Sequence, residues 1–300
     1  MAKKNEEVST VRRAKHGGIL TVIFAILSFL WIAPILIVFL NSFKRKAFIF
    51  THPFSLSCYS ITEGWDKFKA GITRAFCGWL NYSNGIRKTN LWECFGTSLF
   101  ITIGSVALII LCCSMCASYI TRVHTKVTKT IYVLCLFSMI VPFQMVMFTL
   151  SKFANILHLS NPLGIIIVYL GFGAGLAVFM FTGFVKGISL EIEEAAMIDG
   201  CSPLQTFFKV VFPILKPTTV TVAILEAMWV WNDYLLPYLV LSSKYRTIPI
   251  AVQYLKQSHG QIDWGAMMAV LVLAILPIII FYIACQKYII EGVLAGAVKG

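Results

Sequence analysis

Residues 194–217 read EAAMIDGCSPLQTFFKVVFPILKP, a polar and punctuated stretch in a chain that is otherwise strongly apolar. Ser189 is a plausible N-cap for a helix that contains the first of these residues, and Gly200 can end that helix because glycine adopts a positive φ without strain. Ser202 and Gln205 have the spacing of a capping box at the start of a second helix. The pattern therefore predicts two short helices joined by a tight turn.

The second short helix is expected to have one apolar face. Its apolar residues recur at i, i+3, i+4 and i+7: Leu204, Phe207, Phe208 and Val211. Pro213 and Pro217 are expected to end this helix before the next apolar stretch, because proline lacks the N–H that a helix interior needs.

Acidic side chains dominate the first short helix and the turn after it: Glu191, Glu193, Glu194 and Asp199. Helices that lie on a membrane surface usually carry Lys and Arg on their polar face. An amphipathic linker resting on lipid is therefore the weaker interpretation. A compact acidic knob fits better into a protein socket that contains Arg or Lys.

The composition is that of an integral membrane protein. Of the 300 residues, 58% are hydrophobic and 13% are charged, whereas soluble chains are about 45–50% apolar and about 25% charged. The net charge of +12 is spread over the loops, without a basic groove that contains aromatics. Attraction to anionic lipid headgroups explains it better than nucleic-acid binding.

The apolar stretches predict an all-α bundle of six transmembrane helices, each long enough to cross a bilayer. They are expected at about 19–40, 95–119, 131–150, 163–185, 218–241 and 265–286. A long irregular loop over 41–94, expected to be extracellular, follows the first helix. The remaining five helices form a core over 95–286, with the two short helices at about 189–216 on the cytoplasmic side.

Both termini, 1–18 and 287–300, are predicted to be cytoplasmic tails. The positive-inside rule alone hardly decides this, since thirteen Lys and Arg lie on that side and twelve on the other, eight of them in the long loop. The first apolar stretch is too long for the apolar region of a signal peptide, and we expect it to remain uncleaved.

The fifth span carries polar groups that are costly inside a membrane. Glu226, Trp229 and Asp233 share one face by their spacing. This face could line a translocation pathway. Alternatively, Asn232 and Asp233 could bond a neighbouring helix or backbone loosened near Pro237.

The quoted stretch also resembles a known signature. Glu194-Ala195-Ala196, Asp199-Gly200, Phe207 and Pro213 are similar to the EAA motif of permease subunits of ATP-binding-cassette importers. Cys201 and Phe212 stand where that family usually has Ala and Leu. The resemblance implies a type I (MetI-like) permease fold, in which this segment is the coupling helix that docks on a separate cytoplasmic ATPase.

A narrower resemblance points to MalG-like permeases of bacterial carbohydrate importers. It rests on three segments: 141–144, 231–237 and 292–300. It implies a heterodimer with a second homologous permease, a cytoplasmic ATPase dimer and an extracellular or periplasmic solute-binding protein. In some members the C-terminal tail reaches between the ATPases. The pathway-lining residues would be Gln144, Trp231, Asn232, Asp233 and Tyr234.

No motif for catalysis or for metal binding is present. The chain has no G-x-x-x-x-G-K-[ST] phosphate loop, so no cofactor is expected on it, and ATP with Mg²⁺ would be used by the partner ATPase. The loop 242–264 is either a contact for the solute-binding protein or a simple connector. Cys58, Cys77 and Cys94 could form one disulfide, whose pairing the sequence leaves open. An ABC permease for a non-sugar solute and an ion-coupled secondary carrier remain alternatives.

Overall fold

The computed structural model describes residues 17–257 and 262–297, and within these ranges every regular element is a helix. The first helices along the chain are α1 (Gly17–Ser42), α2 (Lys46–Thr51), η1 (Ile61–Glu63), α3 (Trp65–Ala75), α4 (Leu80–Thr89) and α5 (Leu91–Arg122). They are followed by α6 (Lys126–Ile140), α7 (Phe143–Ile156), α8 (Pro162–Val185), α9 (Leu190–Ile198), α10 (Pro203–Thr206), η2 (Phe207–Val211) and α11 (Phe212–Ile214). The last are α12 (Lys216–Asn232), α13 (Leu235–Val240), α14 (Ile248–Gln257) and α15 (Trp264–Ala297).

Four helices are each long and apolar enough to cross a membrane, namely α1, α5, α8 and α15. Two further helix pairs pass the same test only if each bent pair counts as one span, which gives up to six spans in the described residues. The all-helical membrane fold predicted from the sequence is thus confirmed. Two of the predicted spans, however, are not single straight helices.

The third predicted span, 131–150, is broken in the middle. α6 ends at Ile140, α7 begins at Phe143, and their axes differ by 107°. Val141, which precedes Pro142, has an extended backbone with φ −72° and ψ 118°. The proline ring disfavours helical backbone at the residue before it, so the helix ends there.

The fifth predicted span, 218–241, is interrupted as well. α12 ends at Asn232, and Asp233 has an extended backbone with ψ 125° before α13 begins. At its other end α12 follows the preceding helical segment, Pro203–Ile214, at an angle of 77°. The sequence suggested that Pro213 and Pro217 would end a helix, but neither does. Each lies in the first turn of α11 or α12, where the missing N–H has no partner to lose.

The predicted irregular loop 41–94 is instead a small helical subdomain made of α2, η1, α3, α4 and the first turn of α5. Lys44 is 3% exposed, and its ammonium group donates to Asn41 Oδ1 at 3.0 Å and to the His52 carbonyl at 2.9 Å. Asn81 donates to the carbonyls of Ser42 and Lys44. The Asn81 bonds join positions 39 and 37 residues apart and fix the fold of the segment, and sequence periodicity does not reveal them.

The predicted tails differ from the structure at one end. α15 continues as helix to Ala297, so most of the predicted C-terminal tail 287–300 is helical. The predicted N-terminal tail lies almost wholly outside the described residues, and α1 begins at Gly17. All nine cysteines, among them Cys58, Cys77 and Cys94, are free thiols, so the possible disulfide is not formed.

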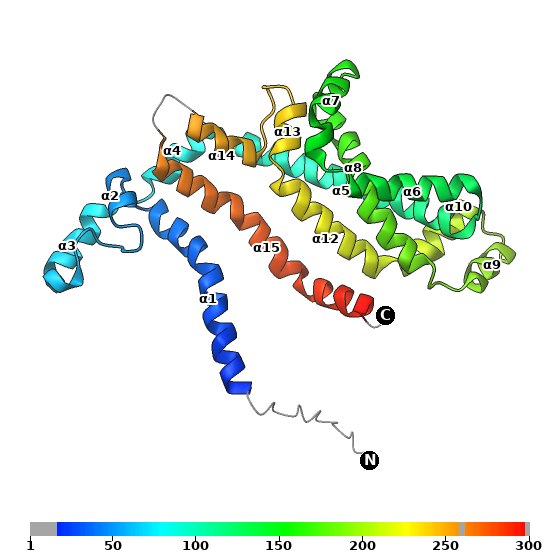
Figure 1. Ribbon diagram of the computed structural model, residues 1–300, viewed down its shortest axis with the longest axis horizontal. Helices are drawn as coiled ribbons and strands as arrows, with labels where there is room; N and C mark the ends of the chain where they lie inside the picture. Colours follow the sequence, from blue (N-terminus) through cyan, green and yellow to red (C-terminus); the bar gives the residue numbers. More distant parts are fainter. Residues whose placement is uncertain (1–16, 258–261, 298–300) are drawn as a thin grey trace, which may run out of the picture.

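The centre of the bundle is the contact between α5 and α8. A buried apolar cluster joins residues of these helices, such as Ile109 and Phe181, to Phe207, Leu215 and Val222 further along the chain. Figure 1 shows α2, α3, α4 and α14 towards one end and α9 and α10 at the other. It also shows α1 diverging from the bundle, and no residue of its membrane-spanning window is buried.

Candidate functional site

The segment 189–216 forms a projecting knob at one end of the molecule, which we call the coupling knob. Ser189 precedes α9 as its N-cap residue, although its side chain makes no capping bond. Gly200 has φ +88° and turns the chain there, a backbone conformation that only glycine adopts easily. Ser202 and Gln205 form the predicted capping box, with the Ser202 N–H donating to Gln205 Oε1 at 2.9 Å.

One side of the coupling knob is buried in the bundle. Phe207 is 7% exposed and Val211 is 1% exposed, and both belong to the apolar cluster of α5 and α8. Leu204 and Phe208 are exposed, so only part of the expected apolar face is buried in the bundle. Residues 207–211 form a turn of π-helix, which shifts the following side chains around the axis relative to an α-helix.

The other side of the knob is free and combines apolar with acidic groups. Its exposed apolar residues are Leu190, Ile192, Met197, Ile198, Leu204 and Phe208. Its exposed acidic residues are Glu191, Glu194 and Asp199. Contiguous exposed apolar surface with charged residues around it is typical of a protein-docking site.

An ion pair fixes the first knob helix to the bundle. Arg122, the last residue of α5, donates to Glu193 Oε1 through Nη2 at 2.7 Å and Nε at 2.9 Å. The same Nη2 donates to the Ile188 carbonyl at 2.9 Å. The Arg122 side chain is 21% exposed and that of Glu193 is 11% exposed, so water screens the pair only in part.

The residues of the predicted motif therefore separate into two groups. Glu194, Ala195, Asp199, Gly200 and Pro213 are exposed. Ala196 and Phe207 are buried, and Phe207 belongs to the apolar cluster of the bundle.

Glu193 is not part of the free acidic surface, and this role was not predicted from the sequence. Its partner Arg122 was not predicted either. A lone Arg at the end of a long apolar helix, in a chain with one acidic cluster, was the available signal.

Asp233 lies where α12 ends, and it makes both kinds of contact considered in the structural alternative. Its Oδ2 accepts from the Tyr169 hydroxyl at 3.0 Å, which links it to α8. Its Oδ1 accepts from the N–H of Leu235 at 3.0 Å and that of Leu236 at 3.4 Å, which caps α13. Both oxygens of the carboxylate therefore accept hydrogen bonds, and these bonds stabilise the break between α12 and α13.

The other predicted pathway residues do not converge on one point. Trp231 is 8% exposed and packs edge-to-face on Phe95. Asn232 is exposed and donates to the Met228 carbonyl of its own helix at 2.7 Å. Tyr234 stacks on Tyr238, and Gln144 is exposed on α7.

Glu226 is the most deeply buried of the acidic residues in the described ranges. It is 1% exposed, and its Oε2 has no hydrogen-bond partner among those residues. It faces Gly173 of α8 so closely that a Cβ there would lie 2.9 Å from Oε2. Glycine at this position therefore makes room for the carboxylate between α8 and α12.

The fold and the coupling knob define a multi-helix membrane transport subunit. Residues 109–294 match the family described as "Binding-protein-dependent transport system inner membrane component". This match covers more than half of the chain, and the chain belongs to that family of inner membrane components.

Its relatives include permeases for sugars. The chain is 38% identical to the probable starch degradation products transport system permease protein AmyC of Thermoanaerobacterium thermosulfurigenes, over 94% of this chain and 96% of the relative. It is 32% identical to the multiple sugar-binding transport system permease protein MsmG of Streptococcus mutans, over 94% of each.

The same architecture occurs in a solved structure. The chain superimposes with a TM-score of 0.70 on a chain of a bacterial ABC transporter involved in the import of the acidic polysaccharide alginate. The two are 21% identical, and the match covers 96% of this chain and 99% of the other. This likeness shows a shared fold.

Proposed function

We propose that this chain is the transmembrane subunit of an ATP-driven importer that carries a sugar or an oligosaccharide across the cytoplasmic membrane. The observation that carries the proposal is the coupling knob, which is fixed to the bundle by Arg122 and Phe207 and is free on its opposite side. The sugar assignment is supported by the relatives, whose names specify starch degradation products and multiple sugars.

In this proposal the knob faces the cytoplasm and docks on a separate ATPase dimer, which alone binds ATP and Mg²⁺. Glu194 and Asp199 supply exposed negative charge for a basic socket, and Met197, Ile198 and Leu204 supply apolar contact area. The buried side of the knob transmits the movement of the ATPases to α5, α8 and α12, because it is packed into their common cluster.

Two further partners complete the proposed importer. A second, homologous permease would form the other half of the pathway, and α1 offers it a helix whose membrane-spanning window has no buried residue. A solute-binding protein would deliver substrate at the end that carries α2–α4 and α14 (Figure 1). Gln144, Trp231, Asn232, Asp233 and Tyr234 are proposed to line the pathway in one of its conformations.

The proposal is tested by reversing charge on the free side of the knob. The importer is purified with its partners from the native membrane and reconstituted, and uptake of labelled maltooligosaccharides is measured with ATP inside the vesicles. Glu194→Lys is expected to release the ATPase and abolish uptake, whereas Glu93→Lys, an exposed reversal at the start of α5, is expected to leave both intact.

Two outcomes would contradict the proposal in different ways. Full uptake and full ATPase retention with Glu194→Lys would remove the docking role of that residue. A chain that purifies alone and transports without ATP would be an ion-coupled carrier.

A further inference from the structure

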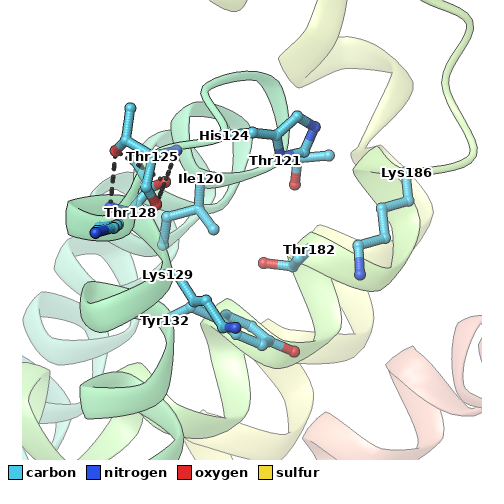
Figure 2. Close-up of a pocket in the computed structure, with 10 residues that line it drawn as sticks. Ile120, Thr121, His124, Thr125, Thr128, Lys129, Tyr132, Thr182 and Lys186 are labelled. Atoms are coloured by element: carbon cyan, nitrogen blue, oxygen red, sulfur yellow. Dashed lines mark hydrogen bonds between the residues drawn. The ribbon is translucent and has the colours of Figure 1, made fainter.

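A basic pocket lies beside the coupling knob, where the α5–α6 turn faces the end of α8. Its volume is about 440 Å³, and its lining includes His124, Lys126, Lys129 and Lys186. Figure 2 shows the side chains of this pocket arranged around one open space, with Lys129 and Lys186 entering from different helices.

The charge of this pocket has no counterpart within the described part of the chain. Three ammonium groups line it, no carboxylate does, and none of the three forms an ion pair with a described residue. Glu193 does not neutralise these lysines, because its carboxylate is paired with the Arg122 guanidinium. α6 begins at Lys126, so the positive end of its helix dipole adds to the same field.

A buried hydroxyl without a partner points into the same space. Thr182 is 2% exposed, and its Oγ1 has no hydrogen-bond partner among the described residues. Figure 2 shows this oxygen directed into the pocket, towards the side lined by Ile120 and Lys129. A buried hydroxyl is normally hydrogen-bonded, so this one lacks an acceptor that a bound ligand would supply.

The position of the pocket indicates which acceptor is available there. It lies at the ends of the membrane helices α5 and α8, where lipid headgroups lie. Ile120 and the Tyr132 ring give it an apolar wall beside the charged groups. Basic pockets between membrane helices bind the headgroups of anionic lipids.

We propose that this pocket binds a phosphate group. Lys126, Lys129 and Lys186 neutralise its charge, and the Thr182 hydroxyl donates to one of its oxygens. The phosphate is that of an anionic phospholipid headgroup or of a soluble phosphate compound, which share this chemistry. The binding requires no particular transported solute, so it stands independently of the proposed function.

A bound phosphate would also connect α6 to the end of α8, which leads into the knob. Lys126 and Lys129 belong to α6. Thr182 lies in the last turn of α8, and Lys186 directly follows that helix, three residues before Ser189. The ligand would therefore bridge α6 to the base of the knob, next to the Arg122–Glu193 pair.

Ligand retention is measured on the full-length protein, purified in a neutral detergent with the partners that it retains. Dioctanoyl phosphatidylglycerol or dioctanoyl phosphatidylcholine is added, and native mass spectrometry counts the lipid molecules retained on this chain. Radiolabelled inorganic phosphate is measured separately by equilibrium binding. The pocket variant is Lys126→Gln/Lys129→Gln/Lys186→Gln. The matched control is Lys67→Gln/Lys152→Gln/Lys287→Gln, three exposed lysines outside the pocket and outside the knob.

The wild-type chain and the control are expected to retain phosphatidylglycerol in preference to phosphatidylcholine, and the pocket variant is expected to lose this preference. Thr182→Val, which removes only the hydroxyl, is expected to bind about tenfold more weakly, as for loss of a hydrogen bond to a charged group. Binding of inorganic phosphate that is lost in the pocket variant, without retention of phosphatidylglycerol, would assign the site to a soluble phosphate.

The proposal would be overturned if the wild type retained the two lipids equally and if the pocket variant also bound inorganic phosphate as the wild type does. Equal loss of binding in the pocket variant and the control would overturn it as well. If the triple pocket variant does not fold, Lys186→Gln and Thr182→Val decide the matter. Each is expected to weaken binding, and wild-type binding in both would overturn the site.

Discussion

The hydroxyl of Tyr169 donates to the carboxylate of Asp233 at 3.0 Å, so the interior of α8 is bonded to the point where α12 stops. Tyr169 is fully buried, and its ring also packs edge-to-face on Trp229 of α12. These side-chain contacts therefore stabilise the break in the fifth predicted span.

Tyr169→Phe is expected to destabilise this break. The variant keeps the ring contact with Trp229 and loses only the bond to Asp233, which should cost about 1 kcal/mol for a hydrogen bond between membrane helices. A double-mutant cycle with Asp233→Asn, read from unfolding in mixed micelles, measures the coupling. Tyr238→Phe, at a half-exposed ring, is the control and should be neutral. Absence of coupling in the cycle would show that the bond contributes nothing.

Glu193→Gln is expected to loosen α9 while Glu191→Gln on the same helix is not. Glu193 accepts two hydrogen bonds from Arg122, and loss of its charge should cost about 2 kcal/mol, as for charge-assisted hydrogen bonds that are partly buried. Hydrogen exchange of the α9 amides should accelerate by more than about tenfold. Similar acceleration in both variants would mean that general negative charge, rather than this pair, holds the helix.

Gly200→Ala and Gly183→Ala are expected to have opposite effects. No atom lies within 4 Å of a Cβ built at either position, so neither variant creates a clash. Gly200 has φ +88°, and alanine there should cost about 1 kcal/mol of backbone strain. Gly183 lies inside α8, where alanine should stabilise by up to about 1 kcal/mol. Unfolding midpoints of the two variants check the sign, and a loss in both would point to a cause other than φ.

The contact between α4 and α15 is expected to weaken in acid. Burial alone would raise the pKa of Asp263, but the hydrogen bonds from Lys88 and Ala266 and the charges of Lys88 and Lys46 outweigh it and lower the pKa. A carboxyl group with a lowered pKa in the folded state stabilises that state above its unfolded pKa. This stabilisation is lost as the pH falls from the unfolded pKa of an aspartate, about 4, through the lower pKa of the folded state.

Hydrogen exchange of the α4 amides, followed against pH, measures this effect. The wild type should lose protection at acid pH, and Asp263→Asn should show reduced protection at neutral pH with little further loss in acid. The same acid dependence in the variant would assign the effect to other carboxyl groups.

The sequence predicted those features whose signals are local. The capping box at Ser202 and the turn at Gly200 depend on residues within a few positions of each other, and both are present. The long apolar helix at 163–185 is also found almost as expected, as α8.

Features that depend on distant contacts were not predicted. Lys44 reads as a surface charge next to a membrane end, yet it is buried because backbone carbonyls at 52 and 53 and Asn41 surround its ammonium group. Likewise, Glu193 differs from Glu191 and Glu194 only because it faces Arg122, which lies 71 positions earlier. The break before Pro142 is a different case, because proline disfavours helical backbone at the residue before it and the sequence alone could have predicted the break.

The one-residue joint at Leu215 has a mechanical consequence. Leu215 is fully buried, and the helical segments on either side of it, 203–214 and 216–232, differ in direction by 77°. A force applied along the first segment therefore reaches the second nearly at right angles to its axis. The two helical segments therefore form one bent unit whose corner is the buried Leu215. A thrust on the knob would tilt α12 sideways, carrying Glu226 and the Asp233 break with it, rather than sliding that helix along its length.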